Sequence, residues 1–92
     1  MKVVINKCFG GFSISEEAYK YLGLEWDRHG YAFNEHNMRV HVNLIEVIEA
    51  LGPKANGRHA ELKIVEVPND VCWRIEEYDG RESIEEIHRS WS

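Results

Sequence analysis

The chain has little of the material that builds secreted or membrane-spanning proteins. Its only two cysteines, Cys8 and Cys72, form no C-x-x-C pair, whereas a disulfide-stapled secreted domain usually carries more. No apolar run approaches the roughly 20 residues of a membrane span, and the apolar run at residues 3–5 is too short for a signal peptide. We therefore expect a cytoplasmic protein with no membrane partner.

Basic charge and ligand motifs are also scarce. The 11 Lys and Arg residues are outnumbered by 16 Asp and Glu, which gives a net charge of −5. A sequence-independent grip on DNA or RNA needs a basic face, so we expect no nucleic-acid polymer as a partner. The five histidines stand in neither H-E-x-x-H nor paired Cys/His spacing, and we expect no metal and no cofactor.

What is present suffices for one modest core. Ninety-two residues with ten aromatic side chains predict a single domain over residues 1–92. Apolar patterns predict strands over residues 2–8, 60–67 and 71–78, and a short strand at residues 31–33. Residues 81–91 fit helical spacing, but the preceding Asp79-Gly80 turn favours a returning strand. We expect an α+β fold, with a central, mostly antiparallel sheet of about four to five strands and two helices on one face.

Two helices are predicted from their end signals. The first runs to about Leu22, with Ser13 as N-cap and Glu16 completing a capping box, or with Ser15 as an alternative cap. Gly23 is expected to end it. The second spans residues 44–51, with Asn43 as the expected N-cap and a Gly-Pro step at residues 52–53 closing it.

A double glycine between the first strand and the first helix is the strongest candidate binding element. Bare N–H groups at a helix start favour an anion. The loop lacks both the G-x-G-x-x-G and the Gly-Lys-Ser/Thr phosphate signatures. Two interpretations stay open, a tight turn or a backbone anion cradle flanked by aromatic rings; the candidate residues are Phe9, Gly10, Gly11, Phe12, Ser13 and Ser15.

Further candidates lie elsewhere in the chain. Arg58 follows an Asn-Gly turn and either clamps an anion or is an ordinary solvated arginine; Arg39 and Arg89 are possible helpers. A hairpin at residues 79–80 would bring Tyr78 near Trp91, for stacking on a base or for packing.

A third possibility is a nucleophilic cysteine. Cys8 would lie near a helix N-terminus, where thiol pKa values fall, with His59 or His88 as its base.

The chain resembles a family of small phage and prophage proteins that has no assigned function. The resemblance rests on KCFGGFS at residues 7–13, ANG at 55–57, IVEVP at 64–68, EEYDG at 76–80 and HRSW at 88–91. It covers most of the chain except about residues 23–42. The family supplies no catalytic residues to transfer to this sequence.

The resemblance implies a context in which small acidic proteins act against host defence. Combined with the candidate residues, it leads us to expect non-catalytic sequestration of a small anionic, nucleotide-like ligand, with a homo-oligomer plausible because ligand pockets often form between protomers. The alternatives are an inhibitor that binds a host enzyme or defence protein, and an enzyme dependent on Cys8.

Overall fold

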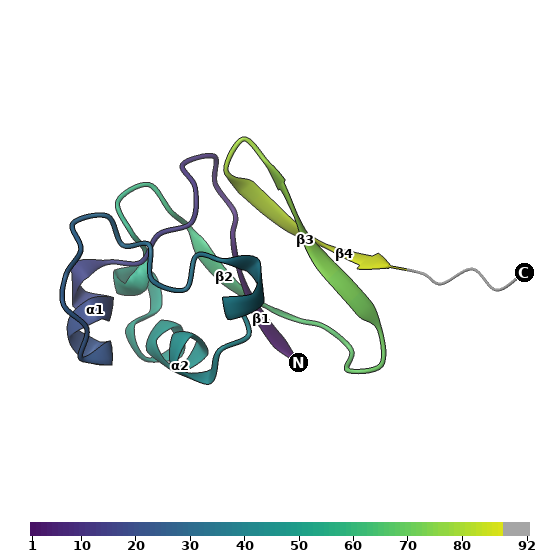
Figure 1. The fold of residues 1–92 in the computed structure, drawn as a ribbon, viewed down its shortest axis with the longest axis horizontal. Helices are drawn as coiled ribbons and strands as arrows, with labels where there is room; N and C mark the ends of the chain where they lie inside the picture. Colours follow the sequence, from purple (N-terminus) through teal and green to yellow (C-terminus); the bar gives the residue numbers. More distant parts are fainter. Residues whose placement is uncertain (88–92) are drawn as a thin grey trace, which may run out of the picture.

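The structure is a computed structural model that describes residues 1–87 (Figure 1). In chain order its elements are β1 (Lys2–Asn6), α1 (Glu16–Leu22), the 3-10 helix η1 (His36–Met38), α2 (Val42–Leu51), the 3-10 helix η2 (Gly52–Ala55), β2 (Leu62–Glu66), β3 (Cys72–Tyr78) and β4 (Arg81–Ile87). The α+β class is confirmed, as is the returning strand after the Asp79-Gly80 turn. Residues 88–91 of that expected strand, with Arg89 and Trp91, lie outside the described residues.

The strands form two separate two-stranded antiparallel sheets and not the single central sheet of four to five strands that the sequence predicted. β1 pairs with β2, and β3 pairs with β4. The physical reason lies at the free edge of β1. The Val4 N–H donates to the Arg39 carbonyl at 2.9 Å, and the Asn6 N–H donates to the Glu82 carboxylate at 2.8 Å. These acceptors take the place of a third strand.

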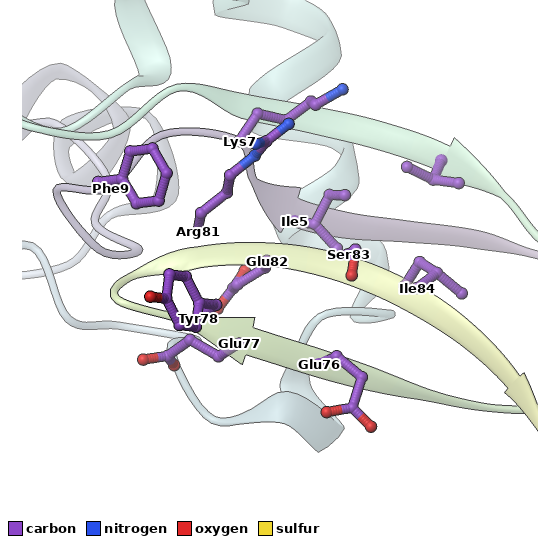
Figure 2. Close-up of a pocket in the computed structure, with 11 residues that line it drawn as sticks. Ile5, Lys7, Phe9, Glu76, Glu77, Tyr78, Arg81, Glu82, Ser83 and Ile84 are labelled. Carbon is purple, nitrogen blue, oxygen red and sulfur yellow. The ribbon is translucent and has the colours of Figure 1, made fainter.

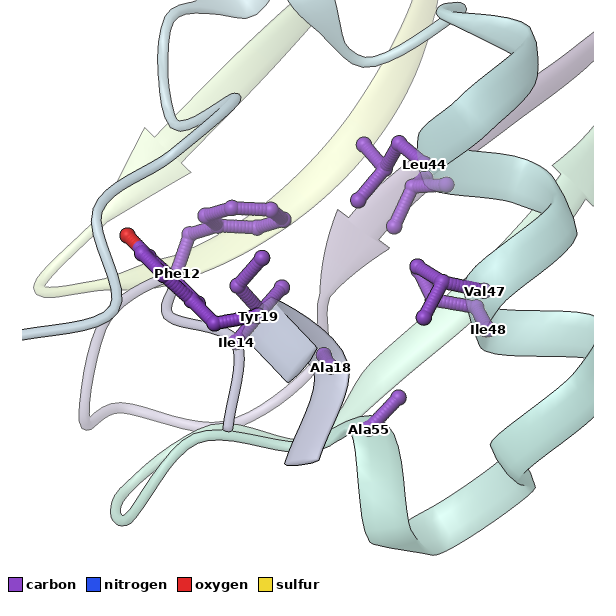
Figure 3. Packing of buried hydrophobic residues seen from close by; sticks show 9 residues of the cluster. Phe12, Ile14, Ala18, Tyr19, Leu44, Val47, Ile48 and Ala55 are labelled. Carbon is purple, nitrogen blue, oxygen red and sulfur yellow. The ribbon is translucent and has the colours of Figure 1, made fainter. Parts of the chain in front are cut away.

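β1 is buried on both faces because it lies between two layers. Its Val4 joins a cluster with both helices, which pack on one face of the β1–β2 sheet as expected (Figure 3). Val3 and Ile5 point to the opposite face, where they pack with Val67, which follows β2, and with Ile75 of β3. The β3–β4 hairpin therefore covers the side away from α1 and α2 (Figure 1). β1, which is apolar on both faces, therefore forms a middle layer, with the two α-helices on one side and the β3–β4 hairpin on the other.

The helix ends correct two details of the sequence interpretation. Ser15, and not Ser13, is the N-cap of α1, and its Oγ accepts from the Ala18 N–H at 3.1 Å. Gly23 ends this helix in the left-handed region with φ +72°, as predicted. The second helix begins earlier than expected, because the His41 ring, and not Asn43, supplies the cap.

The long loop between the helices is built around one carboxylate. Asp27 accepts hydrogen bonds from the backbone N–H groups of Gly30 at 2.6 Å and His29 at 2.8 Å, and from the Tyr19 hydroxyl at 2.8 Å. The expected strand at residues 31–33 is absent from this part of the described chain, since Phe33 has φ +64°, outside the range of a strand. Among residues 1–87 no helix has the length and apolar character to cross a membrane.

Candidate functional site

The double-glycine loop is packed against protein on two sides. A Cβ on Gly10 would stand 1.9 Å from the His59 carbonyl oxygen, and a Cβ on Gly80 would stand 2.5 Å from the Phe9 carbonyl oxygen. The loop is thus held between the turn at residues 57–60 and the turn of the β3–β4 hairpin. Close approach of three backbone segments explains the need for glycine here, which favours the tight-turn interpretation over an anion cradle.

Three backbone N–H groups at and just before the start of α1 are used within the protein. Ile14 donates to the Gly30 carbonyl and Ser15 to the Ala55 carbonyl, each at 2.9 Å, and the Ala18 N–H is capped by the Ser15 hydroxyl. Ser13 is buried beside Gly57. These three donors are therefore not open to an anion, and Ser13 and Ser15 have structural roles.

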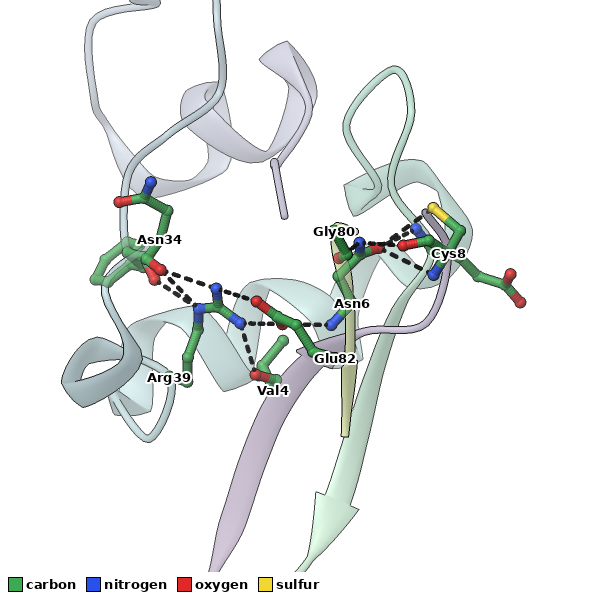
Figure 4. A network of polar contacts seen from close by, with 9 residues as sticks. Val4, Asn6, Cys8, Asn34, Arg39, Gly80 and Glu82 are labelled. Carbon is green, nitrogen blue, oxygen red and sulfur yellow. Dashed lines mark hydrogen bonds and ion pairs between the residues drawn. The ribbon is translucent and has the colours of Figure 1, made fainter. Parts of the chain in front are cut away.

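Arg39 was expected to neutralise a ligand, but the structure buries it in an internal ion pair (Figure 4). Its guanidinium forms a two-pronged pair with Glu82, with Nη2 to Oε2 at 2.8 Å. Further hydrogen bonds go to the carbonyls of Phe33, Asn34 and Val4. The side chains of Arg39 and Glu82 are each 2% exposed, so Arg39 holds the β3–β4 hairpin to the rest of the chain.

Phe12 and Arg58 also have positions that differ from their expected roles. Phe12 is buried, and the Arg39 guanidinium lies 3.7 Å from the centre of its ring, within cation–π distance. Arg58 is exposed in the turn after β-bridge residue Asn56. Neither residue lines the cleft described below.

A cleft lies between the β1–β2 sheet and the β3–β4 hairpin and has a volume of about 660 Å³ (Figure 2). This falls within the range of about 300–1,000 Å³ that is usual for small-molecule sites. Its apolar floor comes from Ile5, Val65 and Ile84. Its polar and aromatic lining is Lys7, Phe9, Glu76, Glu77, Tyr78, Arg81, Glu82 and Ser83.

Two of the predicted ligand-binding residues meet in this cleft. Phe9 is 59% exposed and Tyr78 is 79% exposed, so both rings are open to solvent at the end of the cleft beside the β3–β4 turn. The Arg81 guanidinium lies 5.9 Å from the centre of the Phe9 ring. In Figure 2 the Arg81 side chain runs toward Lys7, which lines the same end.

Lys7 and Arg81 were missed as site residues by the sequence analysis. Each directly flanks a motif that was singled out, since Lys7 opens the glycine loop and Arg81 follows the Asp79-Gly80 turn. The register pairs Tyr78 with Arg81 across the turn, which places a ring and a cation at one hairpin end. The glycine loop then brings Lys7 and Phe9 to that end, a long-range contact that no local pattern reveals.

The charges of the cleft are unevenly compensated. Glu82 is paired with Arg39, and Glu76 is paired with Arg74 at 2.6 Å. Within residues 1–87 Lys7 and Arg81 have no ion-pair partner, and Glu77 is the one lining carboxylate that also lacks one. Figure 2 shows Glu76 and Glu77 pointing away from Lys7. The end of the cleft beside the turn is therefore locally cationic in an acidic protein.

Cys8 makes no hydrogen bond to a histidine ring in the described part of the chain. Its Sγ lies 2.7 Å from the His59 backbone carbonyl and 3.4 Å from the Asn6 side-chain oxygen. These acceptors suit a protonated thiol that donates a hydrogen bond. A nucleophile needs a general base or another source of thiolate stabilisation, and these contacts supply neither. His88, the other candidate base, lies outside the described residues.

Comparison with models of known protein families, with curated protein sequences and with solved structures gave no match.

Proposed function

We propose that this protein binds a small anionic ligand with an aromatic ring, of the nucleotide class, in the cleft between the β1–β2 sheet and the β3–β4 hairpin. The observation that carries the proposal is the grouping of two cations, Lys7 and Arg81, with two exposed rings, Phe9 and Tyr78, at one end of an apolar cleft. This grouping replaces the glycine-loop cradle that the sequence suggested, and it keeps the chemical class of the ligand.

Each part of such a ligand has a matching group. Arg81 can hold a phosphate through two parallel N–H bonds, and Lys7 adds a second positive charge. A base can stack on Phe9 or Tyr78, with offset or edge-on geometry. The apolar floor of Ile5, Val65 and Ile84 would cover one face of the ligand.

The proposed mode of action is sequestration and not catalysis. The cleft supplies charge and stacking surface, while the Cys8 thiol is hydrogen-bonded to a carbonyl and is absent from the cleft lining. The resemblance to phage proteins supplies the biological context of the proposal, in which removing a nucleotide signal would weaken a host defence. Sequestration needs only affinity and abundance, which a small domain can provide.

The test is the melting temperature of the full chain against ATP, ADP-ribose and cyclic dinucleotides. A ligand at 100 times its dissociation constant stabilises the folded state by about 2.7 kcal/mol. For a domain of this size that raises the melting temperature by about 10 °C or more. We expect one of these nucleotides to produce such a shift.

Four variants then locate the site. Arg81→Gln and Lys7→Gln should each reduce the shift strongly, because each removes a cation from the cleft. Arg58→Gln and Lys20→Gln remove matched exposed cations outside the cleft and should leave the shift unchanged. A shift that disappears in Arg58→Gln but survives in Arg81→Gln would move the site to the turn beside the glycine loop. If none of these nucleotides raises the melting temperature, the nucleotide proposal is rejected and a protein partner is favoured.

A further inference from the structure

A second group of side chains meets where η1 approaches the β3–β4 hairpin. His36 of η1, Glu77 of β3 and Glu82 of β4 each offer a donor atom, and these three atoms lie within 4.8 Å of one another. We propose that these residues form a binding site for a divalent first-row transition metal such as Zn²⁺. The inference does not depend on the nucleotide ligand, although Glu77 and Glu82 also line the cleft.

Glu82 supplies a ligand oxygen that is already fixed in place. Its Oε1 accepts from the Asn6 N–H and from Arg39, whereas its Oε2 accepts one hydrogen bond in the described structure, from Arg39 Nη2 at 2.8 Å. A carboxylate oxygen has two lone pairs, so Oε2 retains capacity for one more partner. The residue is 3% exposed, and its orientation is set by the buried network and not by the metal.

His36 and Glu77 supply the two adjustable ligands. Both are exposed, and within residues 1–87 neither side chain makes an ion pair. Donors bound tetrahedrally at about 2.1 Å from Zn²⁺ stand about 3.4 Å from one another. Rotation of the two exposed side chains toward Glu82 can close the remaining gap. Three protein ligands with an open fourth position is the arrangement of a zinc site that still binds water or another molecule.

The donor set selects the type of metal. One imidazole nitrogen with two carboxylate oxygens suits Zn²⁺ or Co²⁺ better than Mg²⁺, which prefers six oxygens in near-octahedral geometry. The two carboxylates favour a dication. The Arg39 guanidinium, which is paired with Glu82, opposes part of that attraction, so we expect moderate affinity.

The test is titration of the full chain with Co²⁺, followed by its visible absorption. Binding at this site should give d–d bands without the charge-transfer band of a thiolate ligand. His36→Ala and Glu77→Gln should each weaken Co²⁺ binding by about tenfold or more. Loss of a residue that only hydrogen-bonds a metal ligand already costs about 10–100-fold, and these two residues would bind the metal directly. Glu82 is left intact in these variants because its removal would disturb the fold.

Matched controls separate the site from general surface binding. His29→Ala removes another exposed histidine, and Glu86→Gln removes another exposed glutamate of β4; both should bind Co²⁺ as the unmodified chain does. The proposal is overturned by equal weakening in His36→Ala and His29→Ala, by thiolate charge transfer that points to Cys8 or Cys72, or by no binding at all. Circular dichroism of each variant checks that the fold is kept.

Discussion

Replacing Arg39 by methionine is the sharpest perturbation of this fold. Methionine keeps much of the apolar stem but removes the guanidinium, and Glu82 is then left buried with the Asn6 N–H as its remaining donor in the described structure. Removing one partner of a buried pair typically costs about 3–5 kcal/mol. A chain of 92 residues has a total stability of about 5–14 kcal/mol. The variant should therefore lose a large part of its stability.

The assay is reversible unfolding in urea and by heat. A loss of 3 kcal/mol lowers the melting temperature of a domain of this size by about 12 °C or more. Lys2→Met is the matched control, because the Lys2–Glu49 pair at 3.3 Å is about half exposed and such pairs contribute about 0–1 kcal/mol. The double variant Arg39→Met with Glu82→Gln should recover part of the loss, since no uncompensated charge stays buried.

The result that would refute this reasoning is a cost of Arg39→Met no greater than that of Lys2→Met. It would mean that the pair is solvated in solution and that the β3–β4 hairpin is held by apolar contacts alone. A double variant less stable than either single variant would likewise show that charge compensation is not the main effect at this position.

Two further predictions concern the first helix and the loop after it. Ser15→Ala should destabilise the protein by about 1 kcal/mol in urea unfolding, and Ser13→Ala by less, because only Ser15 caps α1. Backbone hydrogen bonds from Gly30 and His29 hold the pKa of Asp27 at about 2, below its ordinary value of 3.8. The stabilisation from its carboxylate is thus fully present above about pH 4 and is lost as the pH falls toward 2. The difference in melting temperature between the unmodified chain and Asp27→Asn should shrink over that range; a constant difference would contradict the assignment.

The elements themselves were largely readable from the chain. The apolar patterns at residues 2–8, 60–67 and 71–78 predicted three strands, and the Asp79-Gly80 turn predicted a hairpin. The structure contains all of these elements. The failure at residues 31–33 has a local cause, because Phe33 adopts a positive φ inside a loop organised by Asp27. Tyr and Phe are common in strands, so the residue types of Tyr31 and Phe33 do not indicate a loop. The first predicted N-cap of α1, Ser13, was wrong, because Ser13 is buried beside Gly57. The alternative that the sequence offered, Ser15, is the N-cap.

The candidate site was predicted in part. Phe9 and Tyr78 lie in the cleft, but Arg39 does not, and Lys7 and Arg81 were not recognised. The residues around Arg39 carry no local sign that a glutamate 43 positions later will form a buried ion pair with it. The same is true of His36, whose two partners in the proposed metal site come from a hairpin about 40 residues further along the chain.

The sequence by itself determined both α-helices and the paired strands of this protein, because strand alternation, helix caps and tight turns depend on neighbouring residues. It also determined that β1 would be buried on both faces, since apolar side chains alternate to opposite sides of a strand. Tertiary structure decided what covers those faces and which edges stay unpaired. There the outcome depends on long-range competition for β1. Arg39 and Glu82 satisfy the Val4 and Asn6 N–H groups, so that the expected single sheet is divided into two two-stranded sheets with a cleft between them.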